Sequence, residues 1–251
     1  LDLVEKTSWP TLKDFLNRRA AVFPEGRTAV TLSLSEAKGP KAFLEQANQL
    51  LIALSSFPPV EAPSSWARAK ERANAFGANP KVADVVSRLG TRFGDSEFFP
   101  KWRAIASNAD AKIPSRVEAI RLLQVGGDPE LGKIARGMLG KAPLRHAAIN
   151  ALRQAPGKET AEALVEILPE LGLKQRNQAI NLLGTRPEMA RVLLEAVDSR
   201  TLASSLVSPV MLDQFERFED EEIDALIEKN WSRGGAGVDL AELHSAIEEW
   251  K

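Results

Sequence analysis

The sequence predicts an all-α protein, a solenoid of stacked antiparallel helix pairs. An eight-residue phrase occurs three times, as RVEAIRLL, RHAAINAL and RNQAINLL, starting at Arg116, Arg145 and Arg176. All three copies fit Arg-x-x-Ala-Ile-x-x-Leu, which places the four defined residues on one face of a helix. The starts lie 29 and 31 residues apart. A helix face repeated at this period is typical of an array of helix pairs.

Each copy is followed by a helix breaker and a second amphipathic segment. The breakers are Gly126-Gly127 with Asp128-Pro129, then Pro156-Gly157, then Gly184 with Pro187. Asp128 is a favourable N-cap, and Pro129 suits the first helical position. The second segments carry their apolar residues on one stripe, the first of them through Leu131, Ile134, Ala135, Met138 and Leu139. Short turns of this kind join antiparallel neighbours.

The flanking segments are also predicted to be helical, but less regularly. Helices are expected over 8–22, 40–55 and 65–76, and from Pro80 and Pro100 onward; after the array they are expected over 209–218, 221–231 and 240–250. Residues 25–35 have a β-like composition, yet we expect a loop there because no partner strand is evident.

These patterns suggest three regions of one continuous solenoid of the HEAT or armadillo kind. Residues 1–109 form irregular N-terminal repeats, 110–200 form the regular repeats, and 201–251 form a helical cap. The 251 residues are 44% hydrophobic and 27% charged, which is ordinary for a water-soluble protein. Aromatic residues are scarce, as packing between Ala- and Leu-rich helices allows.

Charge and cysteine content narrow the classes of function. The 33 basic and 34 acidic residues nearly cancel, although 213–251 carry a net charge of −8 and the rest +7. The positive charge is too dilute to predict a nucleic-acid groove. There is no cysteine, which excludes disulfides, zinc–thiolate sites and covalently attached haem within the chain.

The ends of the sequence lead to two further expectations. No apolar run approaches the roughly 20 residues that a membrane-spanning helix needs. The chain opens LDLVEKTSWP, without an initiating Met or a signal-peptide pattern. We therefore expect a segment of a longer polypeptide.

The repeated arginines allow two interpretations. A cation in the first turn opposes the helix dipole by roughly 0.3–1 kcal/mol, so its recurrence requires a compensating partner. In one interpretation the arginines form a ladder on the concave face that grips an acidic partner. We favour a structural role, with each stem at the core edge and each guanidinium bound to carbonyls or to an acid such as Asp110 or Asp128.

Other chemistry-bearing residues give no convergent site. His146 and His244 lack a second ligand at helical spacing, so neither is predicted to bind metal or act as a base. The acid runs Glu219–Glu222 and Glu248-Glu249 are interpreted as solvated faces, and the glycine-rich stretch 234–237 as a connector. Trp66, beside Arg68, Lys70 and Arg72, is expected to pack in the core rather than stack on a nucleic acid.

The chain resembles the HEAT-like repeat region of planctomycete and verrucomicrobial proteins labelled membrane-bound dehydrogenases or haem-binding CxxCH proteins. The matching stretches are GDPELGKIARGMLGKAPLRHAAINALRQAP, LLGTRPEMARVLLEAVDS and SLVSPVMLDQFERFEDEEIDALIEKNW. In that family a β-propeller of the sorbosone or glucose dehydrogenase type precedes the repeats and a cytochrome c domain follows them. The propeller and the Cys-x-x-Cys-His haem site are both absent here. The resemblance implies a periplasmic or cell-envelope spacer between redox modules.

The expected function is therefore a non-catalytic scaffold with no cofactor of its own, which contacts a protein partner or flanking domains of the same polypeptide. Two alternatives remain open. One is a HEAT-like enzyme, either a DNA glycosylase or a lyase that handles a cofactor. The other is a stand-alone oligomeric adaptor that uses the acidic C-terminal helices.

Overall fold

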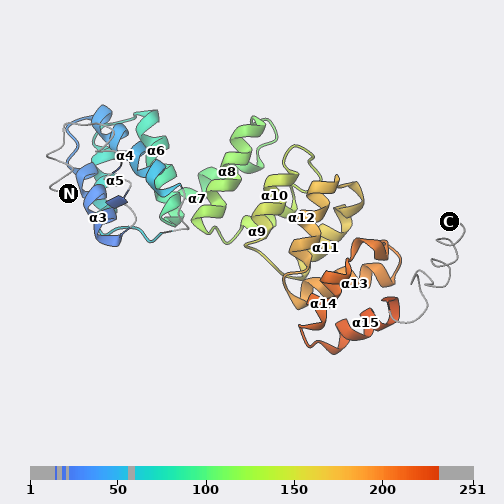
Figure 1. The fold of residues 1–251 in the computed structure, drawn as a ribbon. Coiled ribbons are helices and arrows are strands. Elements are labelled where there is room, and N and C mark those ends of the chain that lie inside the picture. Colours follow the sequence, from blue (N-terminus) through green and yellow to red (C-terminus); the bar gives the residue numbers. More distant parts are fainter. Residues whose placement is uncertain (1–14, 16–18, 21–22, 56–59, 232–251) are drawn as a thin grey trace, which may run out of the picture. The chain divides into compact units, whose positions relative to one another are not determined.

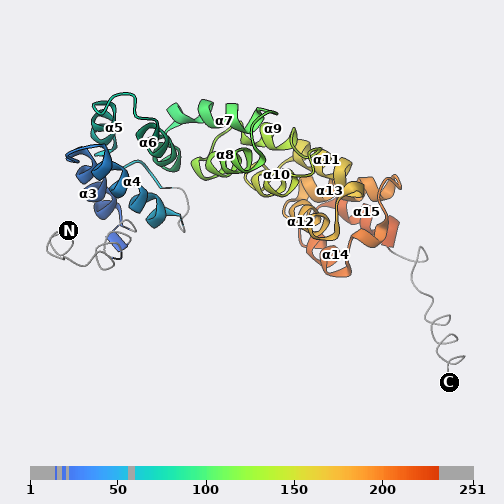
Figure 2. The same cartoon turned by 90° about the horizontal axis from the view of Figure 1, so that it is seen from above.

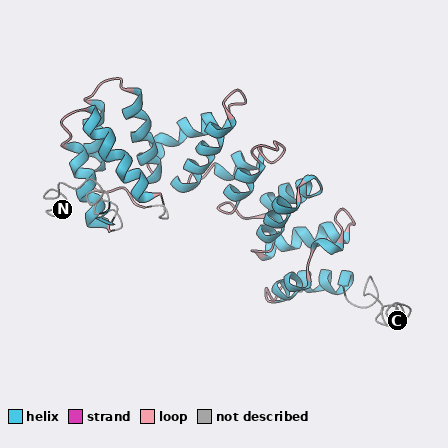
Figure 3. Ribbon diagram, turned by 45° about the horizontal axis from the view of Figure 1, so that its top comes forward, coloured by secondary structure: helices cyan, strands magenta, loops and turns pink. Residues whose placement is uncertain are grey.

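The regular secondary structure of the described residues is entirely helical, with loops and turns between the helices. The computed structural model describes residues 15, 19–20, 23–55 and 60–231. Within these residues there are thirteen α-helices and three short 3-10 helices, and no strand (Figure 3). The prediction of an all-α protein is confirmed. The helix expected over 8–22 lies almost entirely outside the described residues, and the one over 240–250 lies entirely outside them.

The chain divides into two compact units, one up to Ile134 and one from Ala135 (Figure 1). The boundary falls within α9 (Leu131–Arg136), inside the segment 110–200 that the sequence suggests is a single array. We describe each unit by itself.

Unit 1 contains the helices that precede this boundary. They are α3 (Pro24–Ser35), α4 (Pro40–Leu54), α5 (Trp66–Asn74), α6 (Pro80–Arg92), the 3-10 helix η1 (Ser96–Phe98), α7 (Phe99–Ser107) and α8 (Ile113–Gly126). The helix α3 packs against α5, α4 against α6, and α6 against α8, while α7 packs along α8 (Figure 1). Phe43, Leu50 and Leu89 are among the large side chains buried in this unit.

The start of α6 illustrates how the local sequence determines where a helix begins. The side chain of Asn79 accepts hydrogen bonds from the backbone N–H groups of Lys81 and Val82, and Pro80 occupies the first helical position. This arrangement satisfies donors that have no partner inside the helix. The apolar residues then fall on one face, where Val82, Val85 and Leu89 are buried as expected.

The expectation of a loop over 25–35 is wrong, because these residues form α3. Pro24 suits the first helical position, and Val30, Thr31 and Leu34 are buried on the face that meets α5. The preference of β-branched residues against helix is at most about 0.7 kcal/mol per residue. Burial of the apolar face outweighs that cost, which the composition alone could not reveal.

Unit 2 contains the end of α9 and the helices that follow it. They are α10 (Arg145–Leu152), α11 (Lys158–Ile167), η2 (Leu168–Glu170), α12 (Leu173–Leu183), α13 (Pro187–Asp198), η3 (Ser204–Leu206), α14 (Pro209–Glu216) and α15 (Glu221–Trp231). The helix α10 packs against α12, α11 against α13, and α13 against α15 (Figure 2). In these three pairs a helix packs against the one two positions along the chain.

The second segment of the first repeat departs from its expected length. The stripe from Leu131 to Leu139 suggests a helix of that extent, whereas α9 ends at Arg136. The chain continues as tight turns, in which the N–H of Met138 donates to Ala135 O and that of Leu139 to Arg136 O. Gly137 is a poor helix residue at this point. Met138 and Leu139 are nevertheless buried, so the apolar stripe correctly marks the core.

Candidate functional site

The three repeated arginines each bind a backbone carbonyl at, or shortly after, the end of the preceding helix. Nε of Arg116 donates to Ala106 O at 2.9 Å, near the end of α7. Nε of Arg145 donates to Leu139 O at 2.8 Å, in the turn after α9. Nη2 of Arg176 donates to Leu171 O at 2.9 Å, directly after η2. Carbonyls at a helix end have no partner within the helix, and the end carries partial negative charge.

These contacts supply a partner that offsets the unfavourable position of each cation in its own helix. The side chains lie at the core edge: Arg116 is 3% exposed, and the side chain of Arg145 is 12% exposed. Arg145 also pairs with Glu170, with Nη2 and Oε2 2.5 Å apart. Asp128, one of the acids proposed as a partner of these arginines, instead binds Arg103.

Two arginines outside the repeated phrase make the same kind of contact in unit 1. The guanidinium of Arg72 donates to Ala37 O at 2.8 and 2.6 Å, two residues after α3 ends. The guanidinium of Arg92 donates to Leu54 O, the last residue of α4. Arginine donation to a helix end is thus common to both units.

A second set of arginines, which the sequence analysis missed, joins three of the helices to the start of the helix two positions later. Arg103 on α7 binds Asp128 and Glu130, just before α9. Arg136 at the end of α9 binds Glu159 on α11. Arg191 on α13 binds Asp220 at 2.7 Å and also Glu222, at the start of α15. We call these contacts the arginine clamps.

The clamps share one register in the sequence. Glu159 and Glu222 each lie two residues after the residue that directly precedes the helix, which is Gly157 for α11 and Asp220 for α15. Glu130 directly precedes α9 and lies two residues after Asp128, whose side chain accepts from the N–H of Glu130. The donor follows a residue on the buried stripe, as in Trp102-Arg103, Ala135-Arg136 and Ala190-Arg191. Donor and acceptor are 23 to 31 residues apart, close to the spacing of the repeated phrase. This register is the signal that could have revealed the clamps.

The junction between α11 and α13 has an acceptor but no arginine in this register. Glu188 lies two residues after Arg186, the N-cap position of α13. Alignment of Ala161 with Ala190 puts Glu162 where the other helices carry the clamp arginine. Two glutamates therefore occupy the positions that a donor and an acceptor hold elsewhere.

Among the clamp acceptors, Asp128 has the greatest need for a charged partner, because its side chain is buried. The side chain of Asp128 is completely buried, and Nε of Arg103 donates to its Oδ2 at 2.8 Å. Oδ1 of Asp128 also accepts from the N–H of Glu130 at 3.0 Å. A buried carboxylate is tolerated only with such partners, because its desolvation is costly. The glutamate acceptors of the clamps are mostly exposed, and ion pairs between exposed groups contribute little to stability.

The described residues among the histidines and the acid runs form hydrogen bonds with neighbouring groups. His146 is exposed on α10; its Nδ1 lies 3.1 Å from Gln178 Oε1, and its Nε2 lies 3.2 Å from Asn150 Nδ2. In the acid run, Asp220 accepts from the N–H groups of Glu222 and Ile223 and so begins α15. The described residues contain no group of three or more His, Asp or Glu that could hold a metal. His244, Glu248-Glu249 and 234–237 lie outside the described residues.

The prediction that Trp66 packs in the core is confirmed. Trp66 is buried, and its ring meets that of Phe93 edge-on at 5.2 Å between centroids. Its indole N–H donates to Asp95 Oδ2 at 3.0 Å. Lys70, one turn further along α5, pairs with Asp95 at 2.8 Å and with Glu97 at 2.9 Å. Arg68, by contrast, is exposed.

These contacts shift the pKa values of both partners. Hydrogen bonds to Asp95 and Glu97 raise the pKa of Lys70. Burial alone would raise the pKa of Asp95, but hydrogen bonds from Lys70 and Trp66 outweigh burial and lower it. Both groups are therefore held in their charged forms.

Comparison with known proteins places the chain in no family: no family model, no curated protein and no solved structure matches it. Among the described residues, no helix combines the length and apolar character that crossing a bilayer requires.

Arg145→Ala should lower the free energy of unfolding by about 1–3 kcal/mol, because Leu139 O loses a charged donor. The matched control is Arg153→Ala, at an exposed position one residue after α10. It should lower stability far less in the same urea titration. Unchanged stability of Arg145→Ala, together with loss of binding to a protein partner, would favour the ladder interpretation instead.

Asp95→Asn should reduce the acid sensitivity of the protein. Because the folded pKa of Asp95 lies below its ordinary value of 3.8, the charged carboxylate stabilises the fold above that pH. This stabilisation is lost as the pH falls through the lower, folded value. Urea titrations at a series of pH values from neutral to about pH 3 should give a shallower loss for Asp95→Asn. Equal slopes for the two proteins would contradict the assignment.

Glu162→Arg should complete the missing clamp and stabilise the protein by roughly 0.2–1 kcal/mol, as an exposed ion pair does. The gain should disappear when Glu188→Gln is added, because the new guanidinium then lacks its carboxylate. Urea unfolding of the two single variants and the double variant measures both effects. A gain that persists without Glu188 would show that another contact is responsible.

Proposed function

We propose that this chain is a non-catalytic scaffold, an α-solenoid of the HEAT or armadillo kind. It holds a protein partner, or flanking domains of the same polypeptide, in a fixed spatial relation. The observation that supports this proposal best is the set of arginine clamps. Their donors and acceptors are separated by about one repeat, so the charged side chains of these helices serve contacts between successive repeats.

The packing of helices within each unit also supports stacked helix pairs. In unit 2, α10 packs against α12 and α11 packs against α13. In unit 1, α4 packs against α6 and α6 against α8. Contacts between helices two apart in the chain are those expected when equivalent members of successive pairs lie side by side. Such an array offers an extended surface for binding.

The resemblance to the repeat region of the dehydrogenase and haem-binding CxxCH proteins suggests the particular setting. In that setting the chain is a spacer between a propeller of the dehydrogenase type and a cytochrome c domain, in the periplasm or cell envelope. The absence of cysteine from the sequence fits a segment whose haem ligands belong to a neighbouring domain.

The coding frame on both sides of residues 1–251 tests the spacer role. We expect a β-propeller upstream and a Cys-x-x-Cys-His motif within some tens of residues after Lys251. A start codon directly before Leu1 and a stop codon directly after Lys251 would contradict the spacer role. Sedimentation of the protein would then test the adaptor alternative, which requires a homo-oligomer.

A further inference from the structure

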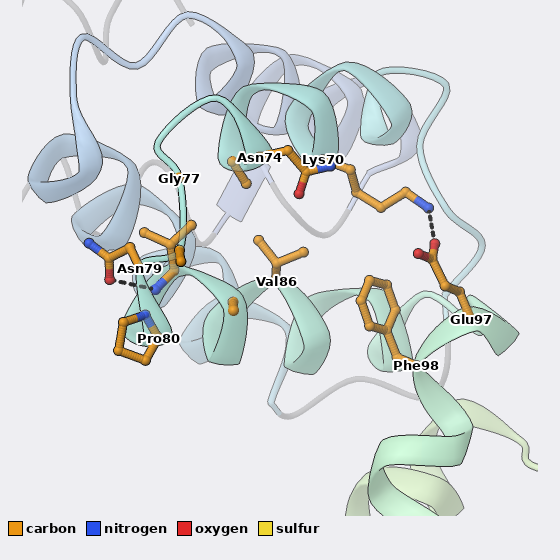
Figure 4. A pocket seen from close by; sticks show the side chains of 12 residues that line it. Lys70, Asn74, Gly77, Asn79, Pro80, Val86, Glu97 and Phe98 are labelled. Carbon is orange, nitrogen blue, oxygen red and sulfur yellow. Dashed lines mark hydrogen bonds and ion pairs between the residues drawn. The ribbon is translucent and has the colours of Figure 1, made fainter.

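Unit 1 contains a cavity of about 410 Å³ beside α5, the turn that follows it, and α6 (Figure 4). Its walls are mainly apolar and are formed by Ala73, Pro80, Val82, Ala83, Val86 and Phe98. Val86 and Phe98 face the space from one side, and the stem of Lys70 runs along the other (Figure 4). This volume is within the range of small-molecule sites, about 300–1,000 Å³.

One end of the cavity is charged. Lys70 and Glu97 both line it, and the ammonium group of Lys70 is shared between Glu97 and Asp95. One cation thus serves two carboxylates, which leaves one negative charge in excess in this cluster. Asp95 is further engaged by the indole N–H of Trp66 and by the backbone N–H of Glu97.

Glu97 is the carboxylate that can accept a ligand. Its side chain is 66% exposed, whereas that of Asp95 is 18% exposed. A carboxylate has about four acceptor sites, so a single contact with Lys70 leaves room for another donor. The ring of Phe98 is already within 5.7 Å of Nζ of Lys70, which shows that a cation is accommodated beside it.

We propose that this cavity binds a small molecule with an apolar body and one cationic head, such as an alkylammonium ion. The body lies against Val82, Ala83 and Val86, and the head donates to Glu97. An anion would have to displace Glu97 from Lys70 and would then face Asp95. A neutral molecule would gain the apolar contact but leave the excess charge unpaired. The site lies within unit 1 and does not depend on the scaffold role.

Titration of the protein with n-octylammonium, monitored by NMR shifts of the backbone amides, tests the site. The head is protonated at pH 7, because alkylamines titrate near the value of lysine, about 10.4. We expect shifts at residues lining the cavity, and weaker binding of n-octanol and of octanoate. Glu97→Gln should weaken octylammonium binding about tenfold, as loss of a charge-assisted hydrogen bond does. The matched control Glu71→Gln, at an exposed position on α5, should bind like the unmodified protein.

A second variant tests the location independently of charge. Ala83→Phe places a ring in the cavity from an exposed position of α6, where it should not disturb the core. It should abolish binding while the circular dichroism spectrum stays unchanged. Equal binding of octanol and octylammonium, normal binding by Glu97→Gln, or normal binding by folded Ala83→Phe would each overturn the proposal.

Discussion

The stability of the structure depends on hydrogen-bond partners for the backbone groups at the ends of its short helices. The described α-helices span 6 to 15 residues, so a large share of their backbone groups lies in first or last turns. The last carbonyls of a helix have no partner within it and must find donors elsewhere. Arginine can supply them from a distance because its long stem packs on apolar surface while its fork of N–H groups reaches a carbonyl. Arg92, Arg116 and Arg145 all act in this way, so the same contact recurs in both units.

The two sets of arginines have complementary tasks. The repeated arginines bind the end of the helix just before their own, and so fix the two helices of a connection relative to each other. The clamp arginines reach forward to the start of the helix two positions later. Their acceptors are acids in or just before first turns, where the helix dipole favours negative charge. The short helix α9, which would be marginal alone, therefore obtains an arginine partner just before its start and another in the turn after its end.

The sequence revealed the first set of arginines but not the second, for a physical reason. The repeated phrase concentrates Arg, Ala, Ile and Leu on one helix, and a period of 3.6 residues makes that face visible in a single segment. A clamp joins residues on two different helices, and the residue before its arginine ranges from Trp102 to Ala190. Its register appears only once the helix starts are known.

Helix positions were predicted well where a proline or capping residue is followed by apolar residues at helical spacing, as at Asn79-Pro80 and the stripe from Val82 to Leu89. They were predicted wrongly at 25–35, where burial against α5 overrides composition.

The cavity beside α5 could not be predicted, because it depends on side chains from three elements and on an ion pair of residues 27 positions apart.

The measurement that tests this account most directly is a double-mutant cycle on Arg103 and Asp128. Arg103→Met keeps the stem, and Asp128→Asn keeps an acceptor for the N–H of Glu130. If the clamp joins α7 to the start of α9, the two changes should be strongly non-additive in urea unfolding. The expected coupling free energy is about 1.5–3 kcal/mol, as for a hydrogen bond to a buried charged group. Additive effects of the two substitutions on the free energy of unfolding would contradict the proposal that this clamp joins the two helices.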